Sequence, residues 1–148
     1  MMRKAEVLEL LKASGKAKAQ QVQDSASAMT GTELNAERDY IPSFKAACEK
    51  MNMLERPLGF VCLSSAGRVV KLIQPYDSTI YTGEPETLPA QFGFVWSDNP
   101  EHALPFVAMA TSPYMTGNCC TEDGVVYRSK KDNNVHSPSA YPQGWERV

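Results

Sequence analysis

The sequence predicts an α+β protein in which a helical amino-terminal segment precedes two small tandem antiparallel β modules. Residues 1–29 are rich in Ala, Lys, Glu, Gln and Leu, which favour helix, and they contain no proline. From about residue 41 prolines and glycines recur, and short β-branched or aromatic runs are bounded by turn residues. We therefore expect a segment for attachment or oligomerisation at 1–43, a degenerate first β module at 44–97 and a second β module at 98–148.

The amino-terminal helix has a narrow and broken apolar face. Its apolar positions follow a spacing of three and four residues, and they are Leu8, Ala19, Val22, Ala26 and Met29. Lys12 and Gly15 fall on the same track, and Gly15 is the place where a bend would occur. Because so little apolar surface leaves an isolated helix marginal, we expect it to rest either on a partner chain, in a homo-oligomer, or on its own chain.

A second, short helix is expected after residue 29. Thr30 and Glu33 have the spacing of a capping box, in which each side chain accepts a hydrogen bond from the other residue's backbone N–H. The helix should end before Pro42, because the residue that precedes a proline is disfavoured in helix. Short strands are then expected at 59–63, 68–73 and 124–129.

An internal repeat relates the two β modules. The landmarks of the first copy are Gly59, Cys62, Gly67, Lys71, Pro85, Pro89 and Phe92. Those of the second copy are Gly117, Cys120, Gly124, Arg128, Pro138, Pro142 and Trp145. The steps from glycine to cysteine, from glycine to the basic residue and from proline to proline to aromatic are equal in both copies, and the length differences fall in loops. Duplication of one small β fold leaves such a pattern, since loops tolerate insertions.

Composition excludes several classes of partner. The net charge is −2, the pI is about 5.7 and 22% of residues are charged. A chain without an excess of basic residues does not have the charge that binding to nucleic acid or to an anionic membrane requires. No stretch approaches the roughly 18 apolar residues of a membrane span. Glu6 and Glu9 lie within the segment that would have to form the apolar region of a signal peptide. We expect a protein made in the cytoplasm without a signal peptide.

Metal binding and catalysis are not indicated. Four cysteines are present, but no C-x-x-C pair occurs, and the two histidines are distant from them in sequence. The cysteines are expected to be small, buried or half-buried thiols, with no metal and no cofactor. The adjacent carboxylates at 84 and 86 and at 122 and 123 lie in or near predicted turns, and no local motif supports pairing Cys119 or Cys120 with a histidine. We therefore expect no enzymatic activity.

The second copy resembles the small chitin-binding type of carbohydrate-binding module, family 5/12. The resemblance rests on Tyr114, Gly117-Asn118, Cys120, Gly124, Tyr127, Pro138 and Trp145, which follow the family's order of Tyr, Gly-Asp, Val, Gly, Tyr, Pro and Trp. It covers residues 110–148 well and 54–96 weakly, and Asn118 and Cys120 replace the family's aspartate and valine. The ending PSAYPQGWERV is similar to variants of the module in tail and tail-fibre proteins of bacteriophages.

This resemblance implies a sugar-binding surface, because aromatic faces pack against the apolar face of a pyranose. The candidate aromatics are Tyr114, Tyr127, Tyr141 and Trp145, with Asp132, Asn133 and Asn134 as polar neighbours. Tyr127 and Trp145 have core positions as their main alternative, whereas Tyr114 and Tyr141 are expected to be exposed. The first copy has Arg56, Val70 and Phe92 at matching positions, with Tyr76, Tyr81 and Trp96 nearby, and we expect it to be mainly architectural.

The resulting hypothesis is a non-enzymatic accessory protein of a phage or prophage tail, located in the virion. Its helix would attach or oligomerise it among other tail proteins, and the second module would bind a host-surface polysaccharide, with several copies supplying avidity. One alternative is a purely structural virion adaptor that binds no sugar. Another is a binding module that serves a separate glycan hydrolase.

Overall fold

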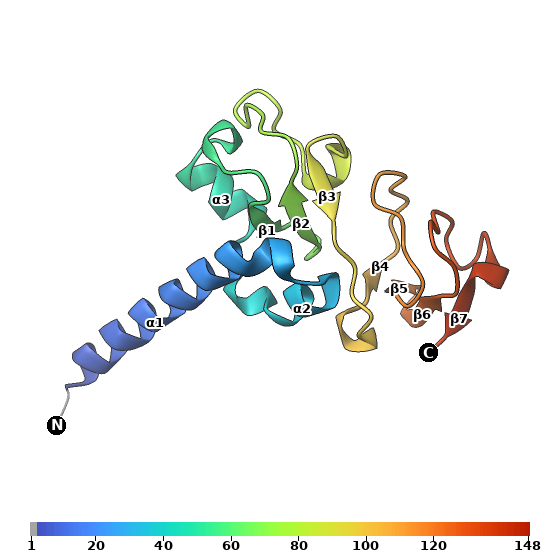
Figure 1. Ribbon diagram of the computed structural model, residues 1–148, viewed down its shortest axis with the longest axis horizontal. Helices are drawn as coiled ribbons and strands as arrows, with labels where there is room; N and C mark the ends of the chain where they lie inside the picture. The colour runs from blue at the N-terminus through green and yellow to red at the C-terminus, as the bar shows by residue number, and fades with distance from the viewer. Residues whose placement is uncertain (1–2) are drawn as a thin grey trace.

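The computed structural model describes residues 3–148 and confirms the α+β class. Three helices come first: α1 (Lys4–Ser25), α2 (Gly31–Ala36) and α3 (Phe44–Lys50). A three-stranded sheet and a four-stranded sheet follow and lie side by side (Figure 1). The amino-terminal part of α1 extends away from the rest of the molecule, and the carboxy terminus lies in the second sheet (Figure 1).

The helices largely follow their local sequence signals. α1 continues through Gly15 without interruption. The predicted capping box at the start of α2 is present, because Glu33 N–H donates to Thr30 Oγ1 at 3.1 Å and Thr30 N–H donates to Glu33 Oε1 at 3.0 Å. α2 is shorter than expected, since it ends at Ala36 and a 3-10 turn, Arg38–Tyr40, completes the segment. α3 was not expected, and Ser43 caps it by accepting the N–H of Ala46.

The first sheet is antiparallel and is buried on both faces. Its strands are β1 (Val61–Leu63), β2 (Val69–Leu72) and β3 (Phe92–Phe94). One face packs on α1 and α2 through the cluster Val22, Ala26, Leu34, Ile41, Val61 and Val69. The other face packs on α3 through a cluster that includes Phe44, Ala47, Cys62, Val70, Leu72 and Phe92. Burial on both faces explains why these strands are nearly continuous apolar runs.

The second sheet contains one parallel pairing that departs from the expected all-antiparallel module. Its strands are β4 (Leu104–Pro105), β5 (Cys119–Glu122), β6 (Val125–Ser129) and β7 (Trp145–Arg147). β5, β6 and β7 pair antiparallel in sequence order, whereas β4 runs parallel to β5. Two residues of parallel ladder carry no periodicity of their own, which is why the sequence did not reveal β4.

The two sheets have the same register at the positions that the sequence repeat equates. Cys62 pairs with Val70 in the first sheet, and Cys120 pairs with Tyr127 in the second. Phe92 pairs with Leu72, and Trp145 pairs with Ser129. The four equivalent glycines, at 59, 67, 117 and 124, all have positive φ, which is the region that glycine enters without steric cost. The spacing of the landmarks therefore corresponds to one hydrogen-bonded unit that occurs twice.

The repeated unit begins before the first landmark glycine of the sequence repeat. Ser43 forms a parallel bridge with Leu63, and Pro105 pairs in parallel with Thr121, so each unit has an entry segment alongside its first strand. The next residue is a phenylalanine in both units. Phe44 packs edge-on against Phe92, with centroids 5.7 Å apart, and Phe106 packs edge-on against Trp145, with centroids 6.0 Å apart.

Gly31 is the glycine that the packing of α2 requires. A Cβ at this position would collide with the backbone carbonyl of Trp96, whereas a Cβ at Gly15 would meet nothing within 4 Å. We expect Gly31→Ala to lower the free energy of unfolding by about 1–3 kcal/mol through overpacking. The matched control Gly15→Ala should raise it by up to about 1 kcal/mol, since Ala favours helix. Urea denaturation followed by circular dichroism measures both, and equal effects would contradict this packing.

Candidate functional site

A continuous cluster of aromatic rings, packed face to face or edge to face, joins the two sheets. We call it the aromatic seam, and it consists of Phe94, Trp96, Phe106, Tyr114 and Trp145. Trp96 lies just after β3 of the first sheet, and its indole N–H donates to the carbonyl of Ser112 at 2.9 Å. Phe106 follows β4, and Trp145 begins β7. The seam therefore crosses the expected boundary between residues 97 and 98.

Tyr114 lies inside the seam, which contradicts its expected exposure. Only 1% of its surface is accessible. Its ring is stacked on Trp96, at 4.3 Å between centroids and 8° between planes, and is also stacked on Phe106 at 5.3 Å. Burial raises the pKa of its phenol, so the hydroxyl stays protonated. Tyr114 therefore has no accessible ring face for a sugar, because other aromatic rings of the protein cover it.

Trp145 and Tyr127 belong mainly to the core of the second unit. Trp145 is buried, packs edge-on against Tyr114, and donates its indole N–H to the carbonyl of His136 at 2.8 Å. Tyr127 is half-buried against the same cluster, on the sheet face that it shares with Cys120. Both occupy the core positions that were their alternative to sugar contact.

Of the remaining candidates, Tyr141 lies in a small surface patch with Lys131 and His136, which we call the Tyr141 surface. Tyr141 is half-buried, and the ammonium of Lys131 lies over its ring, 5.3 Å from the centroid. The His136 ring is tilted at 6.1 Å. Asp132 and Asn133 are exposed, and Asp132 accepts the N–H of Thr116 at 2.9 Å.

Asn134 does not belong to the Tyr141 surface, because it is buried. Its backbone bonds that of Tyr114 in both directions, and its side chain donates to Ser129 Oγ and to the Gly144 carbonyl. Its role is to hold the loop that follows β6 against the seam.

A buried charge reinforces the connection between the units. Arg68 is 8% exposed, and its guanidinium donates to Glu86 Oε1 at 3.1 Å and to the carbonyl of Pro105, on β4, at 2.7 Å. Hydrogen bonds of this kind to a buried guanidinium fix geometry, since breaking one leaves a desolvated charge. The seam and Arg68 together hold the two sheets in one arrangement.

Three of the four carboxylates that could act as catalytic groups have structural partners. Glu84 accepts the N–H of Ser65, Glu86 pairs with Arg68, and Glu122 accepts from the backbone and hydroxyl of Ser139. Asp123 is exposed in the turn between β5 and β6. The bonds of Glu84 and Glu86 connect separate loops and turns of the first unit, and those of Glu122 connect β5 to the loop at Ser139.

The cysteines are free thiols, and burial disfavours their ionisation. Desolvation raises the pKa of Cys62 and of Cys120 from 9.0 to about 12. Burial also raises the pKa of Cys48 and of Cys119. Within residues 3–148 no group of three or more His, Cys, Asp or Glu side chains is placed to hold a metal ion. A thiolate nucleophile is thus disfavoured at all four positions.

The amino-terminal half of α1 exposes a set of large apolar side chains. These are Val7, Leu8, Leu10 and Leu11, which are 41–63% exposed. Leu8 and Leu11 continue, at intervals of three and four residues, the helix face that Val22 and Ala26 bury against the first sheet. Among residues 3–148 no helix is both long enough and apolar enough to span a bilayer.

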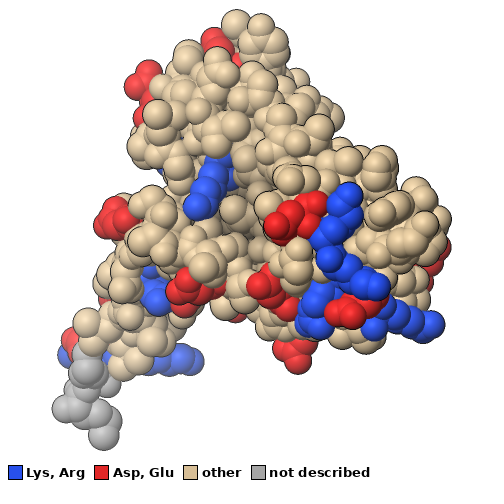
Figure 2. All heavy atoms as spheres, turned by 45° about the vertical axis from the view of Figure 1, so that its right-hand side comes forward, with Lys and Arg blue, Asp and Glu red and all other residues tan. Residues whose placement is uncertain are grey.

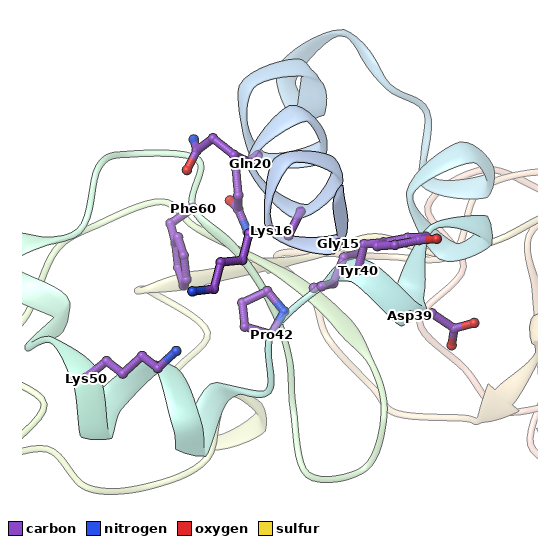
Figure 3. A pocket seen from close by; sticks show the side chains of 11 residues that line it. Gly15, Lys16, Gln20, Asp39, Tyr40, Pro42, Lys50 and Phe60 are labelled. Atoms are coloured by element: carbon purple, nitrogen blue, oxygen red, sulfur yellow. The ribbon is translucent and has the colours of Figure 1, made fainter. Parts of the chain in front are cut away.

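A groove runs along α1 where the helix meets the first unit (Figure 3). This α1 groove has a volume of about 680 Å³. It is lined by α1 through Gly15, Lys16, Ala19, Gln20 and Gln23, and by Asp39, Tyr40, Ile41, Pro42, Lys50 and Phe60 from the segments opposite. No local sequence pattern indicates this groove, because α1 and α3 are brought together only by the sheet between them.

The charged side chains of the second unit are intermixed in sign. Figure 2 shows Lys and Arg beside Asp and Glu on the side of the molecule that this unit presents. A mixed surface of this kind lacks the single-sign patch by which proteins bind a polyanion.

The chain matches no protein-family model, and no curated protein or solved structure is significantly similar to it. The likeness to family 5/12 modules therefore stays a hypothesis based on the spacing of its landmark residues.

The aromatic seam predicts that substitutions of the candidate aromatics lower the free energy of unfolding by different amounts. The hydroxyl of Tyr114 points towards the Val107 backbone without a well-formed hydrogen bond in the described chain, so Tyr114→Phe should change the free energy of unfolding by less than about 1 kcal/mol. Tyr114→Ala should cost about 3–5 kcal/mol, as for other buried aromatics. Tyr141→Ala should cost about 1 kcal/mol or less. Urea titrations would reject the seam if Tyr114→Ala and Tyr141→Ala had equal cost.

The raised pKa of the two most buried thiols predicts slow labelling. With a pKa of about 12 instead of 9.0, the thiolate fraction of Cys62 and Cys120 at pH 8 falls about a thousandfold, a factor of ten for each unit. Ellman's reagent should modify half-buried Cys48 first and reach Cys62 and Cys120 only in denaturant. Peptide mapping by mass spectrometry identifies each site, and rapid native labelling of Cys62 or Cys120 would contradict their burial.

Proposed function

We propose that the protein is a non-enzymatic structural adaptor of a phage or prophage tail, which assembles through α1 and presents its two β units to neighbouring tail proteins. The observation that carries this proposal is the exposed apolar surface on the amino-terminal half of α1. Four large apolar side chains on one projecting helix are typical of a segment that another helix covers. Assembly is therefore the property that this surface supports best.

The arrangement of the β units also supports an adaptor. The aromatic seam and the Arg68 contacts join the two units, so that a neighbour held by one unit is positioned relative to the other. Three of the four aromatics expected to bind sugar are used mainly within the core, namely Tyr114, Tyr127 and Trp145. This use of the aromatics favours the adaptor over the polysaccharide-binding hypothesis.

The setting in a virion tail rests on the sequence resemblance. The carboxy-terminal ending and the paired modules behind a helical leader are the features that are similar to tail-associated proteins. Other tail proteins are accordingly the proposed partners, with production in the bacterial cytoplasm before assembly.

Weak binding of a host-surface polysaccharide is the second candidate function. The Tyr141 surface favours it, since a half-exposed aromatic ring lies beside the ammonium of Lys131 and the imidazole of His136. Sugar hydroxyls use such polar neighbours, and a single shallow site would gain useful strength only from several copies.

Sedimentation velocity on the full chain tests assembly through α1. We expect the wild-type protein to be an oligomer and Leu8→Glu/Leu11→Glu to be a monomer, because two carboxylates replace exposed apolar contacts. Leu54→Glu is the matched control, since Leu54 is 53% exposed in the first unit, and it should leave the oligomer intact. A monomeric wild-type protein at high micromolar concentration would refute the adaptor proposal.

A glycan panel of chitin, peptidoglycan and host surface polysaccharide separates the two candidates. Binding by the wild-type protein that Tyr141→Ala abolishes, with an unchanged sedimentation coefficient, would favour attachment to polysaccharide. No binding by an oligomeric wild-type protein would favour the adaptor.

A further inference from the structure

We propose that the α1 groove is the docking site for α1 of a second copy, which runs antiparallel and places its amino-terminal half in the groove. The inference rests on the proposed assembly through α1 and adds the partner, the direction and the surface. By two-fold symmetry the first copy places its own α1 in the groove of the second, so every contact occurs twice.

The groove has the charge that an acidic segment would need. Lys16 on α1 and Lys50 on α3 extend into it from opposite walls, whereas Asp39 points away (Figure 3). In the described part of the chain neither lysine forms a salt bridge, since the pairs found there are Lys18 with Glu37 and Arg68 with Glu86. Two ammonium groups beside an apolar floor of Pro42 and Phe60 favour a ligand that is both acidic and apolar.

The amino-terminal half of α1 has this combination. It carries Glu6 and Glu9 among Val7, Leu8, Leu10 and Leu11, and all of these side chains are exposed. Glu6 caps its own helix by accepting the N–H of Arg3 at 3.0 Å, which leaves Glu9 as the carboxylate free to pair. An α-helix also fits an open groove of this kind, as amphipathic helices do in other recognition grooves.

The positions on α1 select the antiparallel direction. Glu9 and Lys16 are seven residues apart, so they lie on nearly the same side of the helix. When two copies of α1 run antiparallel about a centre between these residues, Glu9 of each copy lies beside Lys16 of the other, and two ion pairs form. A parallel pair would instead place the two Lys16 side chains at the same level, without a carboxylate between them.

The apolar positions agree with the same arrangement. Leu8 precedes Gly15 by seven residues and Ala19 by eleven, so Leu8 continues the side of α1 that forms the groove wall. In the antiparallel pair Leu8 of one copy faces the small residues Gly15 and Ala19 of the other. Small side chains at such a contact allow the two helix axes to approach closely.

An added β-strand fits the groove less well than a helix. β1 is an edge strand of the first sheet, and an extended peptide would need its free backbone groups. Gln23 already accepts the N–H of Val61 at 3.0 Å and donates to its carbonyl at 2.7 Å, and the N–H of Leu63 donates to Pro42 at 2.8 Å. The edge of β1 is therefore closed.

Charge reversal tests the pairing directly. By sedimentation equilibrium at low salt, Lys16→Glu or Glu9→Lys alone should raise the dissociation constant of the dimer about tenfold or more, because two attractive pairs become repulsive. The double variant Glu9→Lys/Lys16→Glu should dimerise more tightly than either single variant, since both pairs are restored with opposite sign, but less tightly than the wild type, because Lys50 then faces a lysine. Lys50→Glu should also weaken the dimer, and exposed Lys130→Glu, in the second unit, is the control expected to change nothing.

The outcomes separate this inference from the proposed assembly. A wild-type dimer that Leu8→Glu/Leu11→Glu disrupts, but that is unaffected by single charge reversals or no tighter in the double variant than in the single variants, overturns the antiparallel docking and leaves assembly through α1 in place. A monomeric wild-type protein overturns both. Circular dichroism at each step verifies that the variants, all at exposed positions, are folded.

Discussion

Trp96 stacks flat against Tyr114, and most of the architecture depends on this one contact. It lies where the chain leaves the first sheet, and it connects Phe94 on β3 to Phe106 and Trp145 in the second unit. The backbone of Trp96 also lies against Gly31 at the start of α2, so the helical layer is held to the same point. A ring of this size buries more apolar surface than any other side chain here could supply at the junction.

The two units show how a duplicated fold can diverge without losing its hydrogen-bond frame. Their sheets share register, positive-φ glycines and an entry segment that precedes a phenylalanine. The two sheets differ in the elements that pack on their faces. The first sheet is enclosed by α1 and α2 on one side and by α3 on the other, whereas the second uses Trp96 of its neighbour to complete its small core. A unit of roughly forty residues buries too little apolar surface to be stable alone. Packing against Trp96 of the first unit adds to the apolar surface that the second unit buries.

This use of the aromatics bears on function. A ring whose two faces are packed within the protein cannot also offer a face to a sugar, and Tyr114 is in that position. The surface left unsatisfied lies at the other end of the molecule, on α1, where apolar side chains and a cationic groove lie side by side along one helix. Folding of the β units and the proposed assembly through the helix therefore use separate apolar surfaces, and the second of these surfaces is the basis of the adaptor proposal.

The sequence alone determined the features that depend on neighbours in the chain. The capping box of α2, the turn glycines and the spacing of the repeat are short-range patterns, because a turn or a cap is decided by residues within a few positions. Only the tertiary structure decided the two-residue strand β4, the burial of Tyr114 and the existence of the α1 groove. Tyr114 lies 18 residues from Trp96 in sequence, and Lys16 lies 34 residues from Lys50. The sheets decide which distant segments meet, and this decides whether an aromatic residue is buried or exposed to a ligand, and whether two lysines face one cavity. The spacing of residues along the chain does not predict such long-range contacts.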